Sequence, residues 1–105
     1  MILQLNFSNL TPTPAIEEHI ETRVQSALRR FASRLTRVEV HVADLNGQKH
    51  GTDDKRVVIE ARPAGMDPIS VESRGADLYE VVRAGTRKLR DVLARTTERE
   101  RDRKR

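Results

Sequence analysis

The chain of 105 residues contains no cysteine, no tryptophan and only three aromatic side chains, Phe7, Phe31 and Tyr79. The absence of cysteine excludes a disulfide scaffold, a thiolate metal site and a thiol nucleophile, and it favours a reducing, intracellular environment. No apolar run approaches the roughly 20 residues that span a membrane, and the N-terminus lacks the basic start and apolar stretch of a signal peptide. We therefore expect a small cytoplasmic domain with an aliphatic core.

Residues with catalytic or metal-binding chemistry are few and scattered. The histidines, His19, His41 and His50, fall on a predicted helix, a strand and a loop, with no metal-ligand spacing among them. The chain has no Gly-rich phosphate loop after a strand and no GxSxG nucleophile motif. The acidic loop that begins at Asp44 fails as an EF-hand, because Lys55 occupies the position of the required glutamate. We expect no enzymatic activity, no cofactor and no metal site.

Alternation of apolar and polar residues predicts four strands. They occupy Ile2–Phe7, Val38–Val42, Arg56–Arg62 and Pro68–Ser73. Between the second and third strands, the segment Asp44–Asp54 is rich in turn residues and is predicted to be a loop. Each strand has one apolar side, which is typical of a sheet that is buried on one face.

Two helices are predicted from apolar residues at helical spacing. The first runs from Pro14 to about Ser33, with the hydroxyl of Thr13 as its cap. The second opens at Asp77 and continues to about Arg95, where the periodicity fades. The order β-α-β-β-β-α, with one apolar side on every element, predicts an α+β two-layer sandwich. In it, a four-stranded sheet carries both helices on one face, and the helical crossover makes the first two strands parallel.

The net charge of +4 is distributed unevenly along the chain. We expect one domain at residues 1–95 and a basic tail at 96–105 that is a frayed helix end or disordered, since it has no apolar residue. Residues 95–105 hold six basic and three acidic side chains, so residues 1–94 hold fourteen basic and thirteen acidic ones. Sixteen of the twenty basic residues are arginine. A GC-rich genome would explain that preference as well as a phosphate-binding role would, so the placement of the arginines must decide.

Basic residues gather on one side of each predicted helix. At about 100° per residue, Arg83, Arg87 and Arg90 form one stripe opposite the apolar side of the second helix. Arginine suits RNA because its planar group donates two parallel hydrogen bonds to a phosphate. A solvated helix surface is the alternative, but acidic residues would then be mixed more evenly into the stripe. With the flanking residues, the candidate RNA-binding set is Arg23, Arg30, Arg83, Arg87, Lys88, Arg90 and Arg95.

Two short motifs accompany this order of elements. Gly75-Ala76-Asp77-Leu78-Tyr79 enters the second helix, and Arg87-Lys88-Leu89 follows ten residues later. With them, the chain resembles the short form of the ribosome hibernation-promoting factor family, the ribosome-associated inhibitors also called sigma-modulation proteins. The segment Thr11–Phe31 is similar to the family's first helix, and the resemblance covers about residues 2–95.

The resemblance implies a fold similar to a double-stranded RNA-binding domain with an added first strand. It also implies a translation inhibitor that binds ribosomal RNA of the small subunit, occludes the channel of messenger and transfer RNAs, and promotes hibernation under stress. Among the candidate residues, Lys88 matches a family lysine closely, whereas family members often carry acidic residues where Arg83 and Arg87 stand. The sequence lacks the C-terminal domain by which long forms are linked to ribosome pairing, so no self-sufficient pairing role is expected.

Two other functions remain open on the sequence alone. The chain could be a protein-interaction module that uses an exposed sheet edge or the Asp44–Asp54 loop, and such an edge would also allow self-association. Deletion of Gln48–Thr52 should then abolish function. Alternatively, it could be a general binder of double-stranded RNA, with comparable affinity for duplex RNA that is free of ribosomes.

Overall fold

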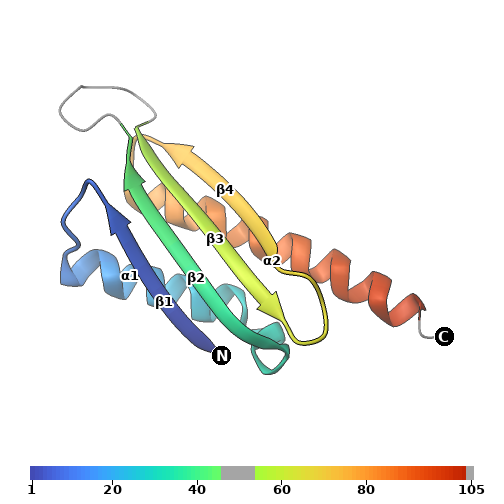
Figure 1. The fold of residues 1–105 in the computed structure, drawn as a ribbon. Coiled ribbons are helices and arrows are strands. Elements are labelled where there is room, and N and C mark those ends of the chain that lie inside the picture. The colour runs from blue at the N-terminus through green and yellow to red at the C-terminus, as the bar shows by residue number, and fades with distance from the viewer. Residues whose placement is uncertain (46–53, 104–105) are drawn as a thin grey trace.

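Four strands and two helices form two layers in the computed structural model, which describes residues 1–45 and 54–103 (Figure 1). The elements are strand β1 (Ile2–Ser8), helix α1 (Pro14–Ala27), the 3-10 helix η1 (Arg29–Arg34), strands β2 (Leu35–Asp44), β3 (Lys55–Pro63) and β4 (Ile69–Gly75), and helix α2 (Leu78–Arg103). Both helices cover the same face of the sheet. The predicted α+β sandwich is confirmed. Most of the predicted Asp44–Asp54 loop, with His50, lies outside the described residues.

The sheet has the strand order β1-β2-β3-β4, with β1 parallel to β2 and the other two pairs antiparallel. Its register aligns apolar residues across all four strands. Leu5 pairs with Val40, Val40 with Ile59, and Ile59 with Val71. Because successive side chains alternate between the faces of a strand, this line and its neighbours two residues away face the helices. The opposite face of the sheet is left for polar residues.

The core between the layers is aliphatic, as the composition predicts. Val24, Ile59 and Leu89 are fully buried, and Phe31 is the one aromatic side chain among the buried hydrophobic residues that the structure describes. Gly85 brings α2 close to the sheet. A Cβ atom at this position would lie 3.3 Å from Ile59 Cδ1, so glycine here leaves room for the close approach of helix and sheet.

The first helix ends earlier than predicted. Helix α1 stops at Ala27, and η1 replaces the last turns of the helix that we expected to reach Ser33. The change occurs at Leu28, whose φ of −105° and ψ of 11° lie outside the α region. The carbonyl of Leu28 then accepts a 2.9 Å hydrogen bond from the N–H of Phe31. This tighter geometry brings residues three apart onto one side, so Leu28 and Phe31 both enter the core.

The second helix ends later than predicted. It continues to Arg103, past the expected end at Arg95, so the tail predicted at 96–105 is helical as far as the structure describes it. Arginine and glutamate have high helix propensity, and they sustain the helix without a buried stripe. The end of α2 extends beyond the sheet (Figure 1). No helix in the described part of the chain combines the length and apolar character needed to cross a membrane.

A charged cluster ties β2 to β3 beside the 46–53 segment. Lys55 Nζ lies 2.8 Å from Asp54 Oδ2 and 3.4 Å from Asp44 Oδ2. The hydrogen bond with Asp54 raises the pKa of Lys55 above its ordinary value. Partial desolvation lowers this pKa by a smaller amount, and Asp44 raises it further. The N–H of Leu45 also donates to the carbonyl of Asp54 at 2.8 Å. The two strand ends are therefore held together independently of the segment between them.

Candidate nucleic-acid interface

Helix α2 starts at the cap that the sequence predicts, and this start packs against α1. Asp77 Oδ1 accepts a 2.9 Å hydrogen bond from the N–H of Tyr79, as an N-cap side chain does. The Tyr79 carbonyl oxygen lies 3.2 Å from His19 Nε2, at hydrogen-bonding distance, and the two rings are 4.7 Å apart. The two helices therefore lie side by side on the sheet, and the side of α1 that carries His19 faces α2.

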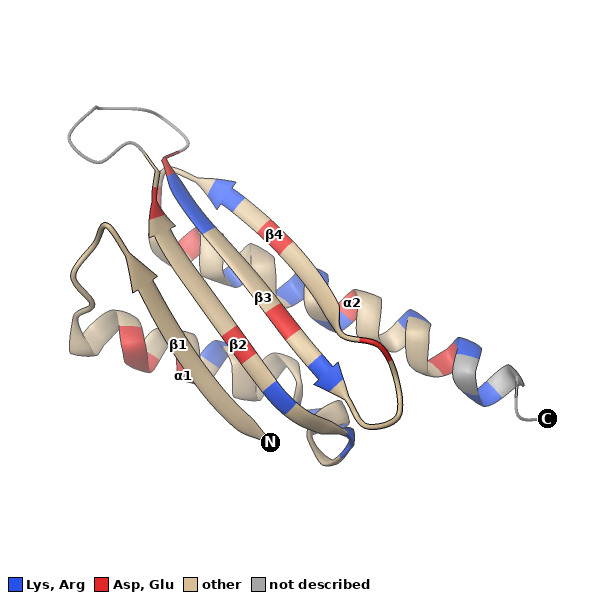
Figure 2. Cartoon of the chain, in the orientation of Figure 1, with Lys and Arg blue, Asp and Glu red and all other residues tan. Residues whose placement is uncertain are grey.

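The predicted arginine stripe lies on the outer face of α2. The buried residues Val82 and Leu89 determine which side of the helix faces the sheet. Arg83, Arg87 and Arg90 lie on the other side and are exposed. Because residues three and four apart are neighbours on a helix surface, the three guanidinium groups form one continuous cationic surface. Figure 2 shows basic segments recurring along α2.

The stripe is only weakly neutralised by acidic neighbours. Arg83 Nη1 lies 3.4 Å from Glu80 Oε1, and Arg90 Nε lies 3.4 Å from Asp91 Oδ1. All four of these side chains are at least 44% exposed, so water screens both ion pairs. Arg87 has no ion pair within the described residues. The three arginines are therefore available to an external phosphate.

Lys88 and Arg95 have different surroundings on the flank of α2. Lys88 Nζ donates a 2.8 Å hydrogen bond to the backbone carbonyl of Glu72 in β4, which directs its ammonium group to the edge of the sheet. Arg95 is exposed and makes no ion pair or side-chain hydrogen bond in the part of the chain that the structure describes. Arg95 can extend the cationic surface, whereas Lys88 must first exchange its backbone partner.

The helix predicted from Pro14 to about Ser33 would hold both Arg23 and Arg30, but in the structure the two residues lie on different helices. Arg30 lies on η1, because the α-helix ends before it, and its guanidinium carbon is 5.1 Å from the centre of the Phe31 ring. Arg23 is half-buried on α1, and its Nε is buried with no hydrogen-bond partner in the described chain. Arg23 follows His19 by one helical turn, so it lies on the side of α1 that faces α2. The two arginines thus reach separate parts of the helix layer.

A second charged surface, which the sequence analysis missed, covers the open face of the sheet. Its ion pairs join Arg37 and Arg62 to Glu39, Arg62 to Glu60, and Arg56 to Glu72, at 2.8 to 3.5 Å. The hydrogen bond with Glu60 raises the pKa of Arg62 above its ordinary value. Basic and acidic segments lie on neighbouring strands in Figure 2. The sequence contains a signal for this surface. At the polar positions of the strands, between the buried residues, basic and acidic residues follow one another.

Within residues 1–45 and 54–103, no three His, Asp or Glu side chains gather closely enough to hold a metal ion. His41 lies on the open face of the sheet, with Nε2 3.9 Å from Glu39 Oε1. Half of the His41 side chain is exposed, which fits a solvated surface residue.

The domain is thus an α+β sandwich in which two helices cover one face of the sheet and a cationic stripe lies on the outer side of the helix layer. The chain belongs to the family described as sigma 54 modulation protein / S30EA ribosomal protein, whose family model matches residues 3–101. This match confirms the resemblance drawn from the motifs at the start of α2. The comparison with curated proteins found no match.

Two solved structures share the fold. A ribosomal subunit interface protein from Coxiella burnetii superposes with a TM-score of 0.76 at 17% identity, covering 93% of this chain and 99% of that one. The N-terminal domain of Protein Y from Thermus thermophilus gives a TM-score of 0.72 at 21% identity, with 91% and 99% covered. At such identities, the likeness concerns the arrangement of strands and helices.

Proposed function

We propose that the protein binds the small ribosomal subunit through its helix layer, occludes the channel of messenger and transfer RNAs, and thereby inhibits translation and promotes ribosome hibernation under stress. The observation that carries this proposal is the exposed stripe of Arg83, Arg87 and Arg90 on α2, in a chain that belongs to a ribosome-associated family. The name of the Coxiella burnetii structure, a ribosomal subunit interface protein, supports the ribosome as the partner.

The physical basis is phosphate binding by charge. Arginine forks match the geometry of phosphate oxygens, and such contacts orient a protein on RNA without reading its sequence. At about 1.5 Å per residue, the 26 residues of α2 extend far enough to follow several phosphates. The domain measures 53 × 23 × 19 Å, so its volume alone would exclude another ligand from the same channel. Inhibition by this route needs no bond to be made or broken.

The proposed contacts extend from the stripe to its surroundings. Arg87 is central, since it is exposed and has no ion pair in the described chain. The half-buried Arg23 lies on the side of α1 that faces α2, next to the stripe-bearing helix. We include all of the basic positions predicted from the sequence, namely Arg23, Arg30, Arg83, Arg87, Lys88, Arg90 and Arg95.

Cosedimentation with purified small subunits tests the proposal. The variant Arg83→Glu/Arg87→Glu should no longer cosediment, because two of the three positions of the exposed stripe would repel phosphate. Arg56→Glu/Arg74→Glu is the matched control: it changes the net charge equally, and its two positions pair across β3 and β4 on the open sheet face. The control should still cosediment. Full binding by the Arg83→Glu/Arg87→Glu protein would contradict the proposed helix interface.

A second arm separates ribosome binding from general affinity for RNA duplexes. Duplex RNA without ribosomes, added as competitor, should displace the protein only at a large excess over small subunits. Equal competition would instead identify a general duplex binder. Sucrose-gradient profiles recorded with and without the protein would then report its preference between subunits and the state of the particles.

A further inference from the structure

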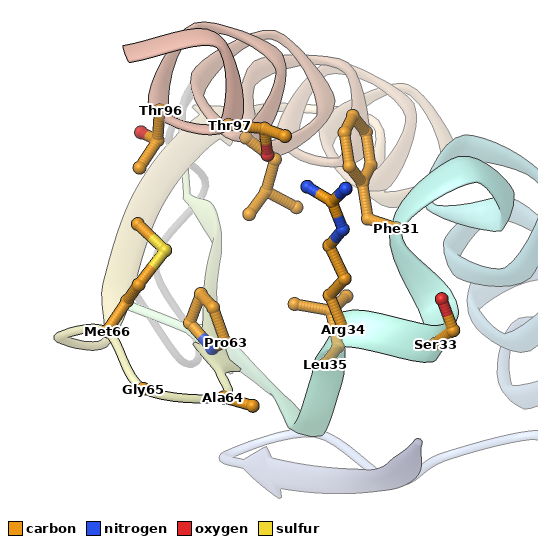
Figure 3. Close-up of a pocket in the computed structure, with 11 residues that line it drawn as sticks. Phe31, Ser33, Arg34, Leu35, Pro63, Ala64, Gly65, Met66, Thr96 and Thr97 are labelled. Atoms are coloured by element: carbon orange, nitrogen blue, oxygen red, sulfur yellow. The ribbon is translucent and has the colours of Figure 1, made fainter. Parts of the chain in front are cut away.

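A pocket of about 370 Å³ lies beyond the end of the core. It is enclosed by η1, by the turn between β3 and β4, and by the C-terminal half of α2 (Figure 3). The pocket exists because α2 extends beyond the edge of the sheet on which it packs. Leu93 is the last buried apolar residue of α2, and Thr96 and Thr97 follow it on the part of the helix that lines the pocket. The strand below ends at Pro63, so no further strand residue can fill the space.

The turn that forms one wall is fixed in place. The N–H of Ala64 donates a 2.8 Å hydrogen bond to the carbonyl of Arg34, which joins the turn to η1. Gly65 has a φ of +74°, in the left-handed region that glycine adopts readily. The N–H of Met66 donates to the carbonyl of Pro63 at 3.3 Å. The pocket is therefore built by three segments that are distant in sequence but held at defined positions.

The chemistry of the pocket is apolar with one cation. Phe31, Leu35 and Leu93 supply buried apolar surface. Arg34 is the only charged side chain among the described residues that line it, and its guanidinium group points into the hollow toward Thr97 (Figure 3). Arg34 has no side-chain hydrogen bond or ion pair within the described chain. Such a site suits a flat, largely apolar group that carries a negative charge.

A neighbouring hollow of about 640 Å³ continues the pocket along α2. The two share Gly65, Met66 and Thr96, and the second adds Arg99 together with one carboxylate, Asp67. An extended ligand can thus meet a cation at both ends of a joined surface. This arrangement favours a chain of repeating anionic units over a compact anion.

We propose that this pocket binds a nucleotide unit, with the base against the apolar wall and the adjoining phosphate on Arg34. The hydroxyl groups of Ser33, Thr96 and Thr97 can meet polar atoms at the edge of the base. Proteins recognise single-stranded RNA through such splayed-out bases, which stack on side chains while cations hold the backbone. The choice of RNA as the source rests on the proposed ribosomal function, whereas a free nucleotide offers the same chemistry.

Titration of the isotope-labelled full chain, followed by NMR, tests the site. Adenosine 5′-monophosphate should shift the methyl signals of Met66, Thr96 and Thr97 saturably at millimolar concentration, and adenosine should bind more weakly. Arg34→Gln should weaken the nucleotide about tenfold or more, as the loss of a charge-assisted hydrogen bond predicts. Arg29→Gln is the matched control, because Arg29 is exposed on the same 3-10 helix but does not line the pocket.

The site is overturned if these methyl signals do not respond, or if both arginine variants weaken the nucleotide equally. A short single-stranded oligonucleotide distinguishes the sources: tighter binding than the mononucleotide supports RNA, and weaker binding supports a free nucleotide. The titration also separates this site from the helix interface. Arg83→Glu/Arg87→Glu should abolish cosedimentation with small subunits and leave the response to the mononucleotide unchanged, whereas loss of that response would overturn the pocket as an independent site.

Discussion

The outer face of α2 and the open face of the sheet both display arginine, but in different electrostatic settings. On the sheet, Arg62 lies within 3.5 Å of Glu39 and 2.8 Å of Glu60. On the helix, Arg87 has no ion pair in the described chain, and the pair of Arg83 with Glu80 is exposed. Arginines that are already paired offer little net charge to a phosphate. The number of arginines on a surface is thus a poor guide to RNA binding, and their pairing is a better one.

The largest effect should come from neutralising the helix arginines. Each charge-assisted hydrogen bond is worth about 1.5–3 kcal/mol, so Arg83→Gln/Arg87→Gln should weaken binding to small subunits by about a hundredfold or more. The slope of log affinity against log salt should also fall by about two, because about one counterion is released per phosphate contact. Affinity measured over a series of salt concentrations reports both quantities.

The corresponding sheet variant, Arg56→Gln/Arg74→Gln, is the control for that experiment. It should leave the affinity and the salt slope almost unchanged, because this face lies on the other side of the sheet from the helices (Figure 2). An equal loss in both variants would mean that overall charge, rather than the helix face, determines binding.

An intermediate effect is expected from making the sheet face resemble the helix face. Glu39→Gln/Glu72→Gln removes the carboxylates that pair with Arg37 and Arg56, while Arg62 keeps its 2.8 Å pair with Glu60. The freed arginines should raise the affinity for ribosome-free duplex RNA by about tenfold through unspecific charge, with a steeper salt dependence. A gel-shift titration measures this gain. Unchanged affinity would show that pairing is not what silences the sheet.

The smallest effect concerns stability. The Glu39 side chain is only 17% exposed and serves two arginines, so Glu39→Gln should lower the free energy of unfolding by about 1 kcal/mol, the upper range for such pairs. Arg87→Gln should change it by less than about 0.5 kcal/mol, as is usual for exposed positions. Urea unfolding curves provide both values. A larger loss for Arg87→Gln would assign that arginine a structural role.

Local spacing predicted much of this molecule. The alternation around Val40 and the helical repeat around Leu89 identified buried residues correctly, because the side-chain periods of strands and helices depend only on the backbone. The stripe on α2 followed from the same geometry. Local spacing failed at Leu28, where the backbone leaves the α region and the α-helix gives way to a 3-10 helix. It also failed beyond Arg95, where helix propensity persists without apolar residues.

The sequence by itself therefore determined the order of elements, the aliphatic core and the position of the helix arginines. Only the tertiary structure decided which charges are paired. Glu39 meets Arg62 because antiparallel pairing of β2 and β3 places them on the same face. Likewise, the pocket at Arg34 needs η1, a turn and α2 to converge. Coulomb interactions depend on distance through space, and strand register and helix packing set those distances. The composition and the residue spacing of the sequence therefore could not show which charges pair.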